Sequence, residues 1–112
     1  MVDASKVINA LPFYTRLWQT GANGVEDRAI VMSAMDEAIE KYNLTVTYDE
    51  ETGLKYGTSN VDGTQYQMWI EDLDSIENKL KAVALRDLAG VAAWRLSYEE
   101  KEVWDLIGKY IP

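Results

Sequence analysis

The sequence predicts an α+β fold with the element order β-α-β-β-β-α-β-α. A three-stranded antiparallel meander forms its middle, and two parallel strands lie outside the meander. Three observations predict this class. Residues 6–17 carry apolar side chains on both alternating faces, which is typical of a strand covered on both sides. Three short runs rich in β-branched and aromatic residues are separated by turn sequences. Apolar residues also recur at helical spacing in two segments, over about residues 28–42 and around residues 76–84.

The first predicted strand covers Lys6–Leu17. One of its faces carries Ile8, Ala10, Pro12, Tyr14 and Arg16, and the other carries Val7, Leu11, Phe13 and Leu17. The turn-rich sequence QTGANGVED follows it as a loop. Val31, Met35 and Ala38 then predict an amphipathic helix over about residues 28–42.

The meander is predicted from the runs LTVTYD, LKYGTS and QYQMWIE. The first two runs are separated by Asp49–Gly53 (DEETG), and the last two by Asn60–Gly63 (NVDG). Both sequences contain a glycine step that suits a tight hairpin turn. The three runs are therefore expected to pair antiparallel with their neighbours in sequence.

The remaining elements complete the order with a helix, a short strand and a last helix. The helix turns Ile76, Leu80 and Val83 inward, and Asp74 with Glu77 forms a plausible capping box at its start. GVAAW is the short buried strand. Ser97 and Glu100 predict a second capping box, which opens a last helix with Val103, Trp104 and Ile107 inward. Trp18, Trp69 and Trp104 are expected in the core, since large aromatic side chains dominate small cores.

Composition excludes several classes of function. The chain has 112 residues, which allows one small domain, and its net charge of −8 would repel a nucleic-acid backbone. It contains no cysteine and no histidine, so thiol chemistry, a Ser-His-Asp triad and zinc–histidine sites are excluded. No segment is long and apolar enough to predict a membrane span, and the start MVDASK shows no signal peptide. No cofactor is expected, and the localisation of the protein stays open.

LPFYTRLW, MWIEDLDSIENKL and LAGVAAWRLSYEEKEVWDLI together resemble the C-terminal portion of glycoside hydrolase family 18. The resemblance is greatest to its bacterial branch of spore-cortex and peptidoglycan N-acetylglucosaminidases. In that family a (βα)₈ barrel carries a small α+β insertion between strands seven and eight. The resemblance implies a single domain over 1–112, with barrel-derived parts at 1–18 and 72–112 and an insertion-like part at 19–71. Strand seven would be Lys6–Leu17, and strand eight Gly90–Trp94.

The resemblance also implies a substrate-binding role for three residues, because the matching side chains of the family line its sugar cleft. By position these are Tyr14, Arg16 and Trp94. An aromatic ring packs against the apolar face of a pyranose, and a guanidinium donates hydrogen bonds to hydroxyls. The alternative interpretation is ordinary packing with an arginine whose charged end reaches solvent.

The catalytic signature of the family, D-x-x-D-x-D-x-E on strand four, matches no window of this sequence. The nearest cluster, EDLDSIE at Glu71–Glu77, has a different spacing. It could hold a cation, but its position at a helix start fits capping better. No catalytic residue and no metal ligand is therefore assigned. On this interpretation, barrel strands one to six lie outside the sequence.

Two functions from different classes follow from these observations. The first is a non-catalytic C-terminal portion, or truncated relative, of a family 18 glycosidase that acts on GlcNAc-containing glycans of chitin or peptidoglycan. The second is a stand-alone carbohydrate-binding module, and a structural or interaction domain is the alternative if both fail. The expected partner is a GlcNAc-containing oligosaccharide, not a nucleic acid or a membrane. A homodimer, or a missing N-terminal half of the barrel, is expected to cover the open strands.

Overall fold

The computed structural model of the chain describes residues 1–111 and confirms the α+β class. The strands are β1 (Ile8–Pro12), β2 (Tyr14–Gly21), β3 (Gly24–Val31), β4 (Thr45–Asp49), β5 (Leu54–Val61), β6 (Thr64–Ile70) and β7 (Gly90–Trp94). The α-helices are α1 (Met35–Lys41), α2 (Leu73–Leu85) and α3 (Val103–Tyr110), and short 3₁₀ turns cover Ala4–Lys6 and Met32–Ala34. Within the described residues, no helix is long and apolar enough to span a membrane.

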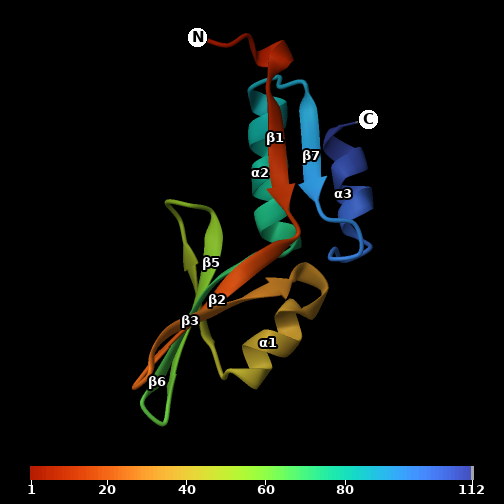
Figure 1. The fold of residues 1–112 in the computed structure, drawn as a ribbon. Helices are drawn as coiled ribbons and strands as arrows, with labels where there is room; N and C mark the ends of the chain where they lie inside the picture. The colour runs from red at the N-terminus through yellow and green to blue at the C-terminus, as the bar shows by residue number, and fades with distance from the viewer. Residues whose placement is uncertain (112) are drawn as a thin grey trace.

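The strands form two sheets that lie end to end (Figure 1). β1 and β7 make a two-stranded parallel sheet, with α2 and α3 beside it. The other five strands make an antiparallel sheet in the order β3-β2-β6-β5-β4. The two predicted parallel strands and the β4-β5-β6 meander are thus confirmed. The turn between β5 and β6 is the two-residue step Asp62–Gly63, with φ of 50° and 84°, as the hairpin prediction requires.

The predicted single strand over residues 6–17 is wrong in one respect, because the chain changes sheets at Phe13. The Phe13 amide donates to the carbonyl of Trp94 at 2.8 Å, which continues the pairing of β1 with β7. The Phe13 carbonyl accepts from the amide of Met32 at 2.9 Å, which is the first contact with the second sheet. The residues before Phe13 therefore belong to the two-stranded parallel sheet, and Tyr14 already belongs to the five-stranded sheet.

The predicted loop and the first part of the predicted helix are replaced by β3. Ala22 and Asn23 close a hairpin, and β3 then pairs with all of β2 from Gly21–Gly24 to Tyr14–Val31. Six of the eight β3 residues are exposed, so this strand is held by backbone pairing and leaves no alternating pattern in the sequence. Helix α1 accordingly begins only at Met35, after a 3₁₀ turn.

Two hydrophobic cores hold the two parts. The first lies between the parallel sheet and helices α2 and α3, and consists of Leu11, Phe13, Met32, Ile76, Leu80 and Val103. The second lies between the five-stranded sheet and α1, and consists of Leu17, Met35, Ala38, Leu44, Met68 and Ile70. Phe13 and Met32 fill the first core from the point where the chain crosses between sheets, so the junction itself is buried.

None of the three tryptophans that were expected in the core is buried. Trp18, Trp69 and Trp104 are 45%, 41% and 43% exposed. Trp104 lies edge-on to Phe13, with ring centroids 5.8 Å apart, while Trp18 and Trp69 lie on the sheet face away from α1. Aliphatic side chains and methionine fill both cores instead, since the flat contact between a short helix and a small sheet leaves little room for an indole.

Both predicted capping boxes are also wrong. Helix α2 is capped by Asp72, whose carboxylate accepts from the Ser75 amide at 3.0 Å while the Ser75 hydroxyl accepts from the Asp72 amide at 2.9 Å. Helix α3 begins six residues after Ser97 and has no side-chain cap. Ser97 instead adopts φ of 78° in the loop after β7. The spacing of acids and hydroxyls pointed to the right regions but to the wrong residues.

Candidate functional site

The carboxyl ends of the two parallel strands lie side by side. In the parallel pairing of β1 with β7, Pro12 at the end of β1 lies opposite Trp94 at the end of β7. β1 runs on into β2 through Phe13, so Tyr14 and Arg16 follow on from this end of the parallel sheet. In sheets built from parallel strands, ligands bind beyond the carboxyl ends. The location of these residues is therefore the one at which a binding site is expected.

The three site residues predicted from sequence are brought together in one hollow. Tyr14, Arg16 and Trp94 line it, together with Ala29 and Tyr98, and its volume is about 200 Å³. Ala29 pairs with Arg16 across β2 and β3, and its small side chain leaves the space open. Trp94 is 66% exposed, which is unusual for a side chain of this size without a partner.

Arg16 is held in place by an ion pair across the sheet. Its Nη1 atom lies 2.6 Å from Oδ1 of Asp27, which lies diagonally across from it on β3. Both side chains are well exposed, at 53% and 38%, so the pair contributes little to stability. It fixes the direction of the guanidinium and leaves its other donors free to bind a ligand.

Tyr98 is the one aromatic residue of the hollow that sequence analysis missed. Its carbonyl accepts from the amide of Ser33, and its amide donates to the carbonyl of Arg95 at 3.2 Å. The guanidinium of Arg95 lies 4.9 Å from the centroid of the Tyr98 ring. The signal that could have found it is its position, because loops that follow the carboxyl ends of barrel strands carry binding residues.

The side chains that line the hollow are of types that can bind a polar ligand. Its five lining residues offer three aromatic rings and one guanidinium, and none of them carries a carboxylate, a thiol or an imidazole. Rings pack on the C–H faces of a ligand, and the guanidinium donates hydrogen bonds to its oxygens. A general acid or a nucleophile for the bound ligand would have to come from elsewhere.

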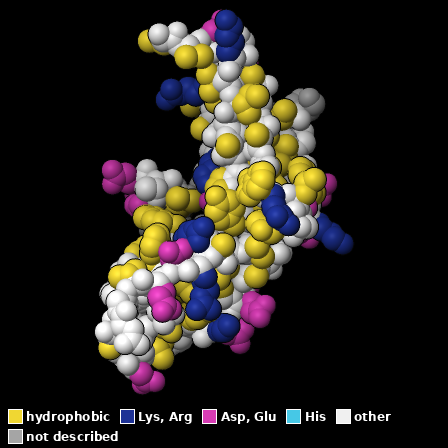
Figure 2. Space-filling model, viewed as in Figure 1, with side chains coloured by type: hydrophobic (Ala, Val, Ile, Leu, Met, Phe, Trp, Pro, Cys, Tyr) yellow, Lys and Arg dark blue, Asp and Glu magenta, His cyan; other side chains and the backbone are white. Residues whose placement is uncertain are grey.

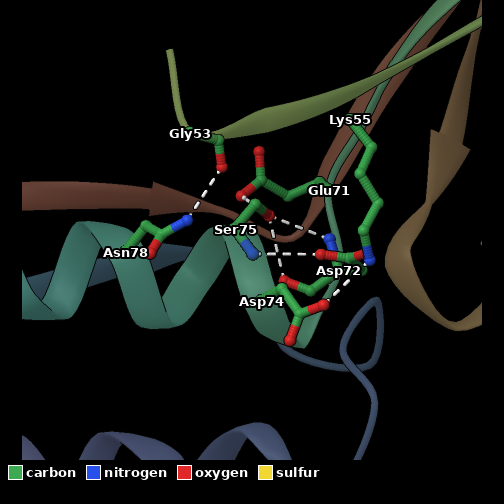
Figure 3. Close-up of polar contacts among 7 residues, drawn as sticks. All are labelled: Gly53, Lys55, Glu71, Asp72, Asp74, Ser75 and Asn78. Carbon is green, nitrogen blue, oxygen red and sulfur yellow. Dashed lines mark hydrogen bonds and ion pairs between the residues drawn. The ribbon is translucent and has the colours of Figure 1, made fainter. Parts of the chain in front are cut away.

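A polar joint fixes the five-stranded sheet on helix α2 (Figure 3). Lys55 Nζ on β5 lies 2.8 Å from both Asp72 Oδ2 and Asp74 Oδ2 at the start of α2. The Asn78 amide donates to the carbonyl of Gly53 at 2.9 Å. The hydrogen bonds to the two aspartates raise the pKa of Lys55, so its charge is secure at neutral pH. These contacts link the part that carries Trp94 to the part that carries Tyr14 and Arg16.

Glu71 is the buried acid of this joint. It is 6% exposed, and its Oε1 atom accepts from the Ser75 hydroxyl at 2.8 Å and from Lys79 Nζ at 2.7 Å. Burial raises the pKa of Glu71, although Lys79 and Ser75 oppose this effect. The cluster Glu71–Glu77 thus serves helix capping and ion pairing. Among residues 1–111 no group of three acidic side chains is placed to hold a metal ion.

The strand that ends at Pro12 and the strand that ends at Trp94 are each followed by a helix on the same side of the parallel sheet. This arrangement defines the class: two β/α units of a barrel, with an antiparallel insertion between the first strand and its helix. The sheet face away from the helices is open, and both Ile8 at the start of β1 and Trp94 at the end of β7 are exposed, at 60% and 66%. Figure 2 shows hydrophobic side chains gathered over this part of the molecule.

The chain belongs to the glycosyl hydrolases family 18, whose sequence model matches residues 1–99. It is 32% identical over 90 residues to a Dictyostelium discoideum protein named Probable di-N-acetylchitobiase 1, covering 77% of this chain and 22% of that protein. The fold matches a chitinase from Chromobacterium violaceum with a TM-score of 0.83 at 22% identity, over 98% of this chain and 34% of that one. The spore cortex-lytic enzyme SleL of Bacillus megaterium gives a TM-score of 0.83 at 23% identity, over 99% and 27%. The chain spans about a quarter to a third of these solved structures.

Proposed function

We propose that this chain supplies one wall of the glycan-binding cleft of a family 18 glycosidase. Tyr14, Arg16 and Trp94 would contact a GlcNAc-containing glycan, from chitin or peptidoglycan. The observation that carries the proposal is that these three residues, which come from two strands far apart in sequence, line one hollow at the carboxyl ends of the parallel strands. The names of the relatives, a chitobiase, a chitinase and a spore cortex-lytic enzyme, support GlcNAc-containing substrates.

The chain alone should bind without catalysing hydrolysis. No carboxylate lines the hollow, and the sequence has no window that matches the catalytic signature of the family. Pure protein should therefore release no chromophore from a chromogenic GlcNAc oligomer beyond the level of a mock purification. Turnover that persists through repeated purification, and that is lost on a substitution in this chain, would contradict this part of the proposal.

Binding is tested by titrating the protein with chitotetraose and following tryptophan fluorescence. We expect a saturable change that Trp94→Ala abolishes and that Trp104→Phe keeps, because Trp104 lies on α3, is not among the residues of the hollow, and has a comparable exposure. A change of the same size in Trp94→Ala, or no change at millimolar sugar, would contradict the assignment.

A second candidate function is a stand-alone glycan-binding module. It is favoured by one observation, namely that all five residues of the hollow come from this chain. The two functions differ in whether the open face of β1 and β7 must be covered by further strands before the chain binds sugar. A part of a larger enzyme needs further barrel strands on that face, while a module binds sugar as it is. Affinity of the isolated chain in the micromolar range would favour the module.

We further propose that the open face is covered by the remaining strands of a barrel. Ile8 and Trp94 are exposed on this face, and both outer edges of the parallel sheet lack a paired strand within the described residues. Unpaired strand edges and exposed apolar side chains favour association. Sedimentation at high concentration tests this. A purely monomeric protein with no tendency to associate would contradict an association-prone face, and a discrete dimer would identify a second copy as its partner.

A further inference from the structure

The tip of the β2–β3 hairpin carries the one Asn-Gly step of the sequence. Ala22 and Asn23 form the turn without a positive φ, and Gly24 follows them with φ of 102°. A tight turn that ends on a glycine of positive φ is a common way to close a hairpin. The tip lies at the end of the five-stranded sheet that is away from the parallel sheet, next to Thr64 of the β5–β6 hairpin (Figure 1). It contributes to neither hydrophobic core.

The side chain of Asn23 is free to react. It is exposed, and among the side-chain hydrogen bonds of residues 1–111 none involves its amide. The amide of Asn78, by contrast, is held by the carbonyl of Gly53 at 2.9 Å. A Cβ added to Gly24 would meet no atom within 4 Å, so the space around this residue is open to water.

An asparagine side chain can react with the backbone amide that follows it. The Gly24 nitrogen attacks the side-chain carbonyl carbon of Asn23, the new C–N bond closes a five-membered succinimide ring, and the side-chain nitrogen leaves as ammonia with the proton of the Gly24 amide. Water then opens the ring. Addition at the side-chain carbonyl gives aspartate and addition at the main-chain carbonyl gives isoaspartate, so an amide and water become an acid and ammonia. The following residue sets the rate, because a Cβ there crowds the attacking nitrogen and glycine has none.

The position of this step at the hairpin tip gives the Gly24 amide the freedom that ring closure needs. Gly21 and Gly24 form the last pair of the β2–β3 ladder. Terminal pairs open at little cost in free energy, and opening releases the Gly24 amide from the ladder. Asn23 and Gly24 also line a hollow of about 210 Å³ together with Gln19 and Glu26. Polar lining of this size has room for water, which is the second reactant.

We propose that Asn23–Gly24 is a site of spontaneous deamidation in the folded protein, which converts the hairpin tip into a mixture of aspartate and isoaspartate. Each product adds a negative charge to the hollow that Glu26 lines, and isoaspartate also lengthens the main chain of the turn by one atom. The hollow lined by Tyr14 lies at the other end of β2, where Tyr14 pairs with Val31. The reaction therefore marks aged protein without changing the proposed glycan site, and its test is independent of that function.

The test incubates the purified chain at pH 8, in buffer and in guanidinium chloride, and follows the tryptic peptide of residues 17–28 by mass spectrometry against a sample digested without incubation. Asn23 is the only asparagine of this peptide. We expect the peptide to gain the mass of the amide-to-acid change and to split into two products, one of which a protein isoaspartyl methyltransferase methylates. Since the tip opens readily, the rate in buffer should lie within about tenfold of the rate in guanidinium chloride. Asn23→Gln should form neither product, and the peptide of residues 42–55, in which Leu44 follows Asn43, should stay unchanged.

The outcomes decide whether the folded hairpin permits the reaction. If the peptide of residues 17–28 keeps its mass in buffer but is converted in guanidinium chloride, the fold protects the step and the proposal is overturned. Equal conversion of the peptide of residues 42–55 would overturn it too, because the reaction would not depend on the glycine. Isoaspartate is measured on the isolated peptide, since Asp62–Gly63 can close the same ring with loss of water and no net change of mass. Conversion in buffer that is absent from Asn23→Gln supports the proposal, whether or not the chain binds sugar.

Discussion

The polar joint at the start of α2 predicts that loss of the Asp72 side chain lowers the free energy of unfolding. This carboxylate caps α2 through the Ser75 amide at 3.0 Å and also pairs with Lys55 at 2.8 Å. Loss of an N-cap costs about 1 kcal/mol, with a range of about 0.5–2 kcal/mol. Loss of a partly exposed ion pair adds up to about 1 kcal/mol. Since Lys55 keeps Asp74 as a partner, we expect Asp72→Ala to lower the free energy of unfolding by about 1.5–2 kcal/mol.

The matched control is Asp74→Ala. Asp74 also lies 2.8 Å from Lys55, but its side chain is 75% exposed and caps nothing. Its loss should change the free energy of unfolding by less than about 0.5 kcal/mol. Urea unfolding followed by circular dichroism measures both variants, and the slope m should stay unchanged while the midpoint of Asp72→Ala falls by about 1 M.

Equal losses in the two variants would refute this reasoning, because the cap would then contribute nothing beyond the shared lysine. A loss below about 0.5 kcal/mol in Asp72→Ala would refute it too. Combining Asp72→Ala with Lys55→Met separates the two contributions. If the cap dominates, the double variant should lose little more than Asp72→Ala alone.

Three further predictions concern stability. Phe13→Ala should lower the free energy of unfolding by about 3–5 kcal/mol in urea, because this ring is fully buried where the chain crosses between sheets; a loss below about 1 kcal/mol would contradict its anchoring role. Gly108→Ala should raise the stability by about 0.5–1 kcal/mol, since Gly108 lies inside α3 and an added Cβ meets nothing within 4 Å; a lower melting temperature would contradict this. The pKa of Glu100 is raised by burial and by the nearby carboxylates of Asp36, Glu102 and Asp72. The folded protein therefore binds the Glu100 proton more tightly than the unfolded chain does, and the free energy of unfolding rises as the pH falls from 7 towards 4.5. Glu100→Gln should therefore be more stable than the native protein at pH 7, by less than about 1 kcal/mol, with the advantage shrinking at pH 5; an advantage that is equal at both pH values would contradict the assignment.

The parts of the fold that bury apolar side chains at regular spacing could be predicted from the sequence. Ile76, Leu80 and Val83 mark α2, and the Asp62–Gly63 step marks the β5–β6 hairpin because a type I′ turn needs positive φ at both residues. The gathering of Tyr14, Arg16 and Trp94 was also predictable, from the resemblance to family 18, and the structure places them around one hollow. Whether they bind sugar stays a prediction.

The parts that depend on long-range pairing could not be predicted. β3 is mostly exposed, so its sequence carries no alternation and only its partner β2 makes it a strand. The same pairing shortens α1, because Ile30 and Val31 belong to the sheet. Lys55 and Asp72 form an ion pair although they lie 17 positions apart in the sequence, and no local sequence pattern predicts such a contact. The exposure of Trp18 and Trp69 also contradicts the usual preference of large aromatics for a core.

The central claim is that Trp94 is part of a glycan-binding site, and the most direct test follows the indole N–H signals of a ¹⁵N-labelled sample. Four tryptophans give four such signals, which single Trp→Phe variants assign. On titration with chitotetraose, the signal of Trp94 should shift progressively to saturation while that of Trp104 stays in place. A Trp94 signal that does not move at millimolar sugar, or that moves no more than that of Trp104, would contradict the claim.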